Sequence, residues 1–317
     1  MSSKGLLLNI RLDAERKAEA FRSLFPDRRI VNYGHEDVDD LAGLTYAVVW
    51  SHEHGLLARM PDLEIIFSLG AGVDHVLSDP NLPDVPLVRF VDANLTGRMV
   101  EWVTLQVLIH LRRQREYDVL QRRSEWHELD TPAAHEVRVG IMGLGELGTA
   151  CLEVLKPLGF QLNGWSRSRK TIAGVTCFSG DSELDSFLGS TDILVSLLPY
   201  TAETHGILNR SLFEKLAKDG ALGGPVVINA GRGKSQVETD IVSCLEDGTL
   251  TGVSLDVFEN EPLAASSPLW GFENVIVTPH MAAVSEANAL SNHVANQIRR
   301  YEAGEELEHV VEKTRGY

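Results

Sequence analysis

The chain has 317 residues, of which 44% are hydrophobic, and its 29 basic and 45 acidic residues give a formal net charge of -16. This length and composition exclude a disordered protein and predict a globular one with room for two domains. The acidic balance excludes nucleic acid and anionic membranes as main partners, because basic surfaces bind both. A small anionic substrate is still compatible with the negative net charge if a local cationic site binds the anion.

Cysteine usage and the N-terminal segment indicate the compartment. Cys151, Cys177 and Cys244 are widely spaced and form no CxxC pair. We therefore expect neither a disulfide framework nor a structural zinc site, and the reducing cytoplasm fits best. The apolar run "GLLLNI" is too short for a signal peptide or a membrane span, and it predicts a first strand.

Short apolar runs alternate with helical segments along the chain. The N-terminal part contains four strand candidates, "LLLNI", "YAVVW", "EIIFSL" and "PLVRF". Residues 94–123 then follow one continuous helical pattern. A second series of strand candidates comes next: "VRVGIMG", "FQLNGWS", "ILVSLLP", "PVVINAG", "TGVSLDV" and "NVIVTPH". Further helices are expected at 146–158, 211–217, 236–247 and 284–303. The pattern predicts an α/β protein with two Rossmann-like domains, each a doubly wound parallel sheet covered by helices.

The segment "VRVGIMGLGELGTACLEVLKPLG" runs from a strand into a helix through G-x-G-x-x-G. Gly143 allows the tight turn, Gly145 lets the backbone approach a pyrophosphate, and Gly148 lets the helix pack close to the strand. A plain glycine-rich turn is the alternative, but the strand-to-helix context favours dinucleotide binding. We expect Glu146 and Leu147, inside the turn, to contact the dinucleotide as well.

The cofactor type is indicated by the segment "WSRSRK". An NAD site normally has an acidic residue about 20 residues after the first glycine, to bind the ribose 2′-hydroxyl. No Asp or Glu lies between Glu153 and Asp181. Cations and hydroxyls would hold a 2′-phosphate instead, from Ser166, Arg167, Ser168 and Arg169. NADP(H) is therefore favoured over NAD(H), and the alternative is a solvated basic turn.

Three polar segments follow later strands, at the sheet edge where doubly wound proteins bind ligands. Arg232 lies between Gly231 and Gly233, Glu261 follows "LDVF", and His280 ends "VIVTPH". Reduction of a 2-keto acid needs a hydride on the carbonyl carbon and a proton on its oxygen. His280 suits the proton donor, and Glu261 would orient the ring and raise its pKa from about 6.5. Arg232 would bind the substrate carboxylate or carbonyl.

Seven stretches in order carry a family resemblance: "SLGAGVDHV", "GLGELG", "LLPYTAETHGILN", "INAGRGKSQVE", "LDVFENEPL", "PLW" and "NVIVTPH". They resemble the D-isomer-specific 2-hydroxyacid dehydrogenase family, whose catalytic Arg, Glu and His map onto Arg232, Glu261 and His280. "VVW", "WSRSRK" and the closing "RGY" resemble its glyoxylate/hydroxypyruvate reductase A subgroup. The resemblance implies NADPH-dependent reduction of glyoxylate or hydroxypyruvate to the D-2-hydroxy acid. The alternatives are a phosphoglycerate-type or bulkier 2-keto acid and a non-enzymatic dinucleotide sensor, which would not need an intact catalytic set.

The resemblance also implies further contacts. The loop with Ala71 and Gly72 would bind the substrate carboxylate, and Trp50 would line the substrate pocket, the alternative being a core or surface aromatic residue. His52 and His54 depart from the expected pattern; we expect exposed loop histidines there and no metal site. The remaining cofactor contacts are expected at Leu198, Pro199, Thr204, Ala230, Gly231, Arg232, Asp256, His280 and Ala282.

The expected organisation is a substrate domain formed by residues 1–98 and 285–317 and an NADP-binding domain formed by residues 99–284. The active site is expected in the cleft between them. By resemblance the protein is a homodimer, with the helix and arm at about 99–130 in the interface.

Overall fold

The computed structural model describes residues 4–10, 13–70, 72–284 and 286–313. They divide into two compact units, one formed by Met1–Leu95 with Val284–Tyr317 and the other by Thr96–Ala283. The second unit is therefore a continuous segment inserted into the first. The expected boundaries, at 98/99 and 284/285, lie within three residues of these two junctions.

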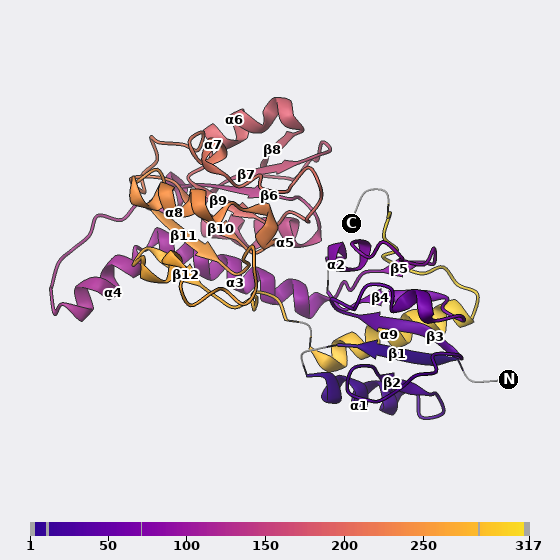
Figure 1. Cartoon of the computed structure of the whole chain (residues 1–317). Helices are drawn as coiled ribbons and strands as arrows, with labels where there is room; N and C mark the ends of the chain where they lie inside the picture. Colours follow the sequence, from indigo (N-terminus) through magenta and orange to yellow (C-terminus); the bar gives the residue numbers. More distant parts are fainter. Residues whose placement is uncertain (1–3, 11–12, 71, 285, 314–317) are drawn as a thin grey trace. The chain divides into compact units, whose positions relative to one another are not determined.

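The first unit is built on a parallel sheet with strand order β2-β1-β3-β4-β5. Its strands are β1 (Gly5–Asn9), β2 (Ile30–Asn32), β3 (Leu44–Val49), β4 (Ile65–Ser68) and β5 (Leu87–Val88). Its helices are α1 (Ala14–Leu24), α2 (Asp74–Leu77) and α9 (Ala287–Glu302). All residues of β3 and β4 are buried, as expected for parallel strands with both faces covered. Helices α1 and α9 pack side by side (Figure 1).

The C-terminal end of α9 is tied to this sheet by Glu302. Its carboxylate accepts two hydrogen bonds from the Arg28 guanidinium, at 2.8 and 2.7 Å. It also accepts one from the Tyr46 hydroxyl at 2.9 Å, from the buried face of β3. Burial and this carboxylate raise the pKa of Tyr46, so the phenol stays protonated. Helix α9 is thus bound to a sheet formed by residues far earlier in the chain.

The second unit is a seven-stranded parallel sheet with strand order β12-β11-β10-β9-β6-β7-β8. Its strands are β6 (Arg138–Met142), β7 (Gln161–Ser166), β8 (Thr176–Ser179), β9 (Ile193–Ser196), β10 (Val226–Asn229), β11 (Gly252–Leu255) and β12 (Val275–Val277). Its helices are α3 (Ala93–Leu111), α4 (Gln114–Arg122), α5 (Glu146–Leu155), α6 (Leu184–Gly189), α7 (Arg210–Phe213) and α8 (Glu238–Glu246). The strand order reverses at β6, which lies between β7 and β9. The carboxyl ends of these strands therefore form a topological switch point.

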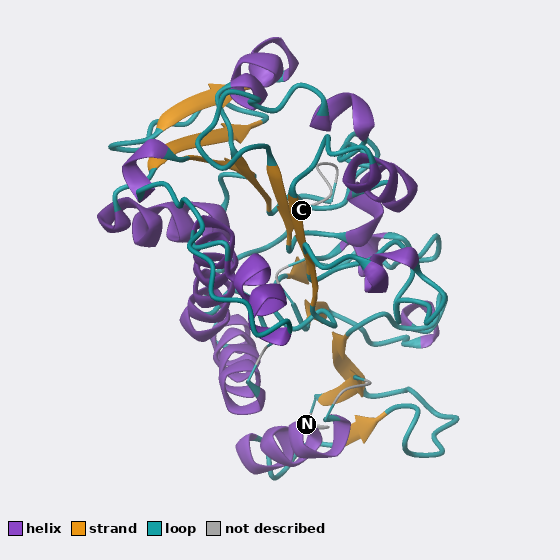
Figure 2. Ribbon diagram, turned by 90° about the vertical axis from the view of Figure 1, so that its left-hand side faces the viewer, coloured by secondary structure: helices purple, strands orange, loops and turns teal. Residues whose placement is uncertain are grey.

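Hydrophobic side chains cover both faces of this sheet. Along β10, Val227 belongs to a core with residues of α6, α7 and α8, whereas Ile228 belongs to a core with residues of α3 and α5. This alternation is the period of two that a strand imposes on its side chains. Figure 2 shows the strands of this sheet running between helices on either side. The predicted α/β class with doubly wound parallel sheets is confirmed.

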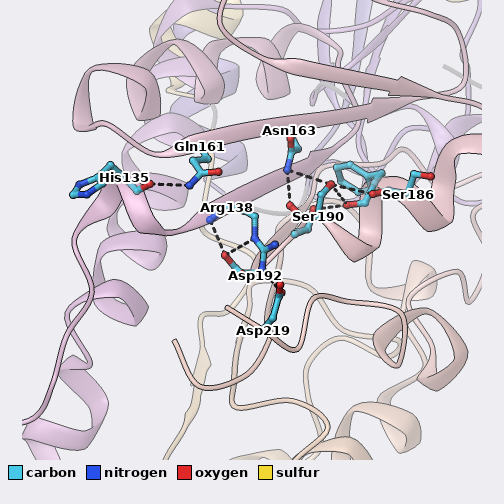
Figure 3. A network of polar contacts seen from close by, with 10 residues as sticks. His135, Arg138, Gln161, Asn163, Ser186, Ser190, Asp192 and Asp219 are labelled. Atoms are coloured by element: carbon cyan, nitrogen blue, oxygen red, sulfur yellow. Dashed lines mark hydrogen bonds and ion pairs between the residues drawn. The ribbon is translucent and has the colours of Figure 1, made fainter. Parts of the chain in front are cut away.

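A polar network ties the amino ends of the strands together (Figure 3). Asp192, which is 1% exposed, accepts hydrogen bonds from the Arg138 backbone N–H at 2.8 Å and from its Nη2 at 2.7 Å. The same Nη2 reaches Asp219 at 2.7 Å. These partners raise the pKa of Arg138. The network joins β6 to the start of β9, at the edge opposite the glycine turn, and we assign it to the stability of the sheet.

Some expected elements differ from the structure. The single helix over 94–123 is wrong, because α3 ends at Leu111 and α4 begins at Gln114. Arg113 lies between them with a left-handed φ of 53°, and its side chain bonds Glu116 and the carbonyl of Asp130. The strands β2 and β8 were not expected from the sequence, and both lie at sheet edges. Within the described ranges, no helix is long and apolar enough to cross a membrane.

Candidate active site and dinucleotide site

The glycine turn lies at the carboxyl end of β6, at the switch point of the larger sheet. Gly143 has a φ of 105°, and a Cβ there would lie 2.9 Å from the carbonyl oxygen of Leu197. A Cβ on Gly148 would lie 2.0 Å from the carbonyl oxygen of Gly143, so only glycine lets α5 start this close to the strand. The Cβ position of Gly145 has no atom within 4 Å. The space beside Gly145 is thus free of other atoms of the protein, as a pyrophosphate bound at the start of α5 would require.

The loop after β9 faces the same edge of the sheet. Leu198 is buried, and Pro199 follows it. The Thr204 hydroxyl donates to the Pro199 carbonyl at 2.7 Å and accepts from the Thr201 N–H at 2.8 Å. Thr204 therefore fixes the shape of this loop. Three residues that follow neighbouring strands are buried as well: Ala230 and Gly231 after β10, and Ala282 after β12.

The basic turn after β7 holds its two arginines differently. The Ser166 hydroxyl donates to the Ser168 carbonyl at 2.8 Å, which closes the turn. Arg169 donates to the Cys177 carbonyl at 2.9 Å and pairs with Glu183, so its guanidinium braces the turn against β8.

Arg167, in the same turn, is exposed. The Thr201 hydroxyl lowers the pKa of Glu203, and the charge of Arg167 contributes to the same shift. Arg167 therefore brings its charge towards the loop that follows β9. The two arginines of one short motif thus have different surroundings.

His280 and Glu261 form a hydrogen-bonded pair. Nδ1 of His280 lies 2.8 Å from Oε2 of Glu261, and Oε1 of Glu261 accepts the Phe258 N–H at 3.0 Å. Both side chains are about one-third exposed, at 36% and 37%. Burial raises the pKa of Glu261, but the hydrogen bond and charge of His280, the Phe258 N–H and the charge of Arg232 together lower it. The carboxylate is therefore ionised at neutral pH and holds one ring nitrogen of the histidine.

Asp256 supports the backbone of His280. It is 1% exposed; Oδ1 accepts the Thr278 hydroxyl at 2.5 Å and the Met281 N–H at 2.8 Å, and Oδ2 accepts the Ala282 N–H at 2.9 Å. Its backbone carbonyl accepts the His280 N–H at 2.7 Å. These bonds hold His280 at a left-handed φ of 56°. The expected contact of Asp256 with the cofactor stays a prediction.

Arg232 follows β10 on a loop that glycines bring close to its neighbours. A Cβ on Gly231 would lie 2.7 Å from the carbonyl oxygen of Leu198, and one on Gly233 would lie 1.8 Å from that of Phe258. Nη1 of Arg232 donates to the Gly231 carbonyl at 2.8 Å. Arg232, Glu261 and His280 thus follow the carboxyl ends of three adjacent strands, β10, β11 and β12. A cation, a carboxylate and an imidazole are gathered there.

In the first unit, Trp50 follows β3 and is half-buried. Its ring packs over Gly70, where a Cβ would lie 2.7 Å from Cζ3, and its centroid lies 4.3 Å from that of His75. The Gly72 carbonyl accepts the Ser68 hydroxyl at 2.9 Å. Ala71 lies outside the described residues. Trp50 and the loop with Gly72 are therefore close neighbours in this unit.

The expectation that His52 is an exposed loop residue is wrong. Its side chain and that of Asp79 are both 0% exposed, with Nε2 of His52 3.1 Å from Oδ2 of Asp79. Asp79 also accepts the N–H groups of Gly55 and Asn81, each at 2.9 Å. Burial lowers the pKa of His52 despite the neighbouring carboxylate, so the ring is neutral. His54 is exposed, as expected.

Sequence reasoning missed a buried polar network beside Arg232 and Glu261. Asn229 and Gln236 are 0% and 2% exposed, and Glu238 and Glu259 bond each other's backbone. These residues stand inside the quoted stretches "INAGRGKSQVE" and "LDVFENEPL". The only sequence signal was the placement of amides and carboxylates between apolar positions.

Comparisons with known proteins bear on the family. The model of the D-isomer specific 2-hydroxyacid dehydrogenase NAD binding domain matches residues 104–282. A glyoxylate/hydroxypyruvate reductase A of Klebsiella pneumoniae strain 342 is 41% identical over 278 residues, covering 86% of this chain and 87% of that protein.

Two solved structures are similar over almost the whole chain. An NADPH-dependent glyoxylate/hydroxypyruvate reductase from Sinorhizobium meliloti, in complex with NADP and sulfate, matches with a TM-score of 0.95 and 50% identity, covering 99% of this chain and 100% of that one. A probable 2-hydroxyacid dehydrogenase from Rhizobium etli CFN 42, in complex with NADP, HEPES and L(+)-tartaric acid, matches with a TM-score of 0.93 and 53% identity, covering 99% of both chains. The chain therefore belongs to the D-isomer specific 2-hydroxyacid dehydrogenase family, as its motifs predicted.

Proposed function

We propose that this protein reduces a small 2-keto acid, glyoxylate or hydroxypyruvate, to the D-2-hydroxy acid with NADPH. The observation that carries the proposal is the His280–Glu261 hydrogen bond beside Arg232, at the same sheet edge as an open glycine turn. The similar proteins from Klebsiella pneumoniae and Sinorhizobium meliloti bear the name of this activity.

The residues present fit NADP(H). The open turn at Gly143, Gly145 and Gly148, with Glu146 and Leu147, would hold the pyrophosphate at the start of α5. Ser166, Arg167 and Ser168 would hold the 2′-phosphate, with Arg169 bracing their turn. The similar structures from Sinorhizobium meliloti and Rhizobium etli are complexes with NADP. When bound, the cofactor supplies the hydride.

Leu198, Pro199, Thr204, Ala230, Gly231, Asp256 and Ala282 would form the rest of the dinucleotide site. We include them because each follows the carboxyl end of β9, β10, β11 or β12, at the edge of the sheet that carries the glycine turn.

The chain's own residues complete the reaction. His280 donates a proton from Nε2 to the carbonyl oxygen of the substrate, because Nδ1 is held by Glu261 at 2.8 Å. The carboxylate fixes the orientation of the imidazole through this hydrogen bond. Arg232 binds the substrate carboxylate or carbonyl and stabilises charge on the oxygen. Partial exposure lets His280 regain its proton from water.

The remaining assignments are also proposals. The first unit would bind the substrate through Trp50, Ala71 and Gly72, and the second unit would bind the cofactor. A homodimer would use the segment at about 99–130. Trp126 in this segment is 98% exposed and Leu105 on α3 is 53% exposed, and a partner surface would cover such apolar side chains. We place the protein in the cytoplasm.

The test is steady-state oxidation of NADPH and, separately, NADH, followed by absorbance with glyoxylate and with hydroxypyruvate. We expect rapid NADPH-linked turnover with at least one of these acids. A strong preference for NADH would refute the assignment of Ser166, Arg167 and Ser168 but leave the reductase. Tight NADPH binding without turnover of either acid would refute the substrate assignment.

A further inference from the structure

The loop that carries Arg232 is closed around a buried amide. Asn229, at the end of β10, is 0% exposed. Its Oδ1 accepts the Gly231 N–H at 3.0 Å, and its Nδ2 donates to the Arg232 carbonyl at 3.2 Å. Nδ2 also donates to Oε1 of Gln236 at 2.8 Å. The backbone on both sides of the Arg232 side chain is thus fixed from inside the protein.

Gln236 extends these bonds to the neighbouring loop. It is 2% exposed, and its Nε2 donates to the Val257 carbonyl at 3.0 Å. The next residue, Phe258, donates its N–H to Oε1 of Glu261. A short path of hydrogen bonds therefore runs from the backbone of Arg232 to the carboxylate that holds His280.

Two glutamates join the same loops at a second point. The Glu238 N–H donates to Oε1 of Glu259 at 2.7 Å, and the Glu259 N–H donates to Oε1 of Glu238 at 2.7 Å. Burial raises the pKa of Glu238, and the charge of Glu259 acts in the same direction. Bringing like charges together is unfavourable. Each carboxylate accepts a backbone N–H of the other residue, and these two hydrogen bonds offset the repulsion between the charges.

We infer that Gln236, Glu238 and Glu259 are positioning residues, which hold the Arg232 loop and the Glu261 loop as one rigid frame for catalysis. This inference rests on the proposed function. We call these three residues, together with Asn229, the loop clasp. None of the three would contact substrate or cofactor; each acts on the placement of Arg232 and Glu261. An error of about 1 Å in such placement lowers rates on the order of a hundredfold.

The first test replaces Gln236 by methionine, which has similar volume and makes neither hydrogen bond. We expect kcat to fall about tenfold to a hundredfold while the NADPH dissociation constant stays within about twofold, because the glycine turn is untouched. The matched control is Gln297→Met in the first unit. Gln297 is also 2% exposed and accepts a backbone N–H, that of Glu308, at 3.1 Å. This control should lower the melting temperature and leave kcat unchanged.

The second test separates the hydrogen bonds from the charges. Glu238→Ala and Glu259→Ala remove an acceptor, whereas Glu238→Gln and Glu259→Gln keep a carbonyl oxygen for the same N–H. We expect each alanine variant to lose about tenfold in kcat and each glutamine variant to stay within about twofold of the wild type. Asp247→Ala is the control, because Asp247 also accepts a backbone N–H, that of Thr249, but follows the opposite end of α8.

Amide hydrogen exchange gives a readout without turnover. In Glu259→Ala the Glu238 N–H should exchange faster, and in Glu259→Gln it should stay protected. Faster exchange with unchanged kcat would overturn the positioning role, and so would glutamine variants that lose as much kcat as alanine variants. A wild-type protein that reduces neither keto acid would instead overturn the proposed function, and with it the role of the clasp in catalysis. The exchange data would then still show whether the bonds exist.

Discussion

Two of the histidine–carboxylate pairs among the described residues, one in each unit, have different surroundings. His52 and Asp79 lie 3.1 Å apart with both side chains 0% exposed. His280 and Glu261 lie 2.8 Å apart with both side chains about one-third exposed. Each histidine follows a parallel strand by a few residues. The two pairs therefore have similar positions after their strands, but they differ in the bonded ring nitrogen, Nε2 in His52 and Nδ1 in His280, and in access to solvent.

Solvent access decides what such a pair can do. Burial keeps His52 neutral, and the carboxylate of Asp79 mainly collects backbone N–H groups from its own loops. A proton donor must be charged, reach the substrate and be reprotonated, and only His280 has the exposure for this. We therefore assign a stabilising role to the His52–Asp79 pair and propose a catalytic role for the His280–Glu261 pair.

The largest expected effect is that of His280→Ala. Loss of the proton donor should lower kcat/KM for the keto acid by about 10²–10⁴-fold, while NADPH affinity and the melting temperature change little. Steady-state kinetics and thermal unfolding on the same preparation would check both. Retention of most of the rate would exclude His280 as the donor.

The ion pair of the buried Asp192 with the half-buried Arg138, at the amino ends of the strands, should affect stability alone. Asp192→Ala leaves the Arg138 guanidinium without its buried partner, and we expect the free energy of unfolding to fall by about 3 kcal/mol. Denaturant unfolding measures this change. Turnover per folded molecule should match the wild type, and a lower kcat at full saturation would contradict the assignment of this network to stability.

The buried His52–Asp79 pair should also affect stability and leave turnover unchanged. Asp79→Ala removes the acceptor for His52 and for two backbone N–H groups, so we expect the free energy of unfolding to fall by about 2–3 kcal/mol. The value of kcat per folded molecule should be retained. A collapse of kcat like that of His280→Ala would show that exposure does not separate the two pairs.

The smallest expected effect is a pH dependence of stability. The pKa of His52 is lower in the folded protein than its ordinary value of about 6.5 in the unfolded chain. Below about pH 6.5 the unfolded chain therefore binds the extra proton, and stability falls at up to about 1.4 kcal/mol per pH unit. Denaturant unfolding of the wild type and His52→Gln between about pH 7 and pH 5 checks this. The variant should lose less stability, and equal losses would remove His52 as the cause.

Much of the fold was predictable because its strands are short apolar runs between turns. β1, β3 and every strand of the larger sheet except β8 were marked in this way. The glycine turn was recognisable because strand, glycines and helix stand in sequence. Arg232, Glu261 and His280 could be proposed from the sequence because each follows such a strand and matches a family motif.

The features that the sequence did not predict mostly depend on contacts between residues far apart in the chain. The burial of His52 is set by Asp79, 27 residues away, which no local pattern reveals. The break at Arg113 depends on a carbonyl 17 residues further on. The edge strand β8 is partly exposed and mixed in character, so it lacks an apolar run. The loop clasp was missed because its bonds are made between two loops.

The contacts of Glu302 have a consequence for synthesis. Residues Thr96–Ala283 form one compact unit inside the chain, whereas α9 is made only after that unit. On the ribosome, the inserted unit can finish folding while the sheet of the first unit still lacks α9, since domains generally fold as they emerge. Arg28 and Tyr46 must wait for Glu302 until α9 has been translated. A chain truncated before α9 would therefore leave one folded unit joined to an unfinished one.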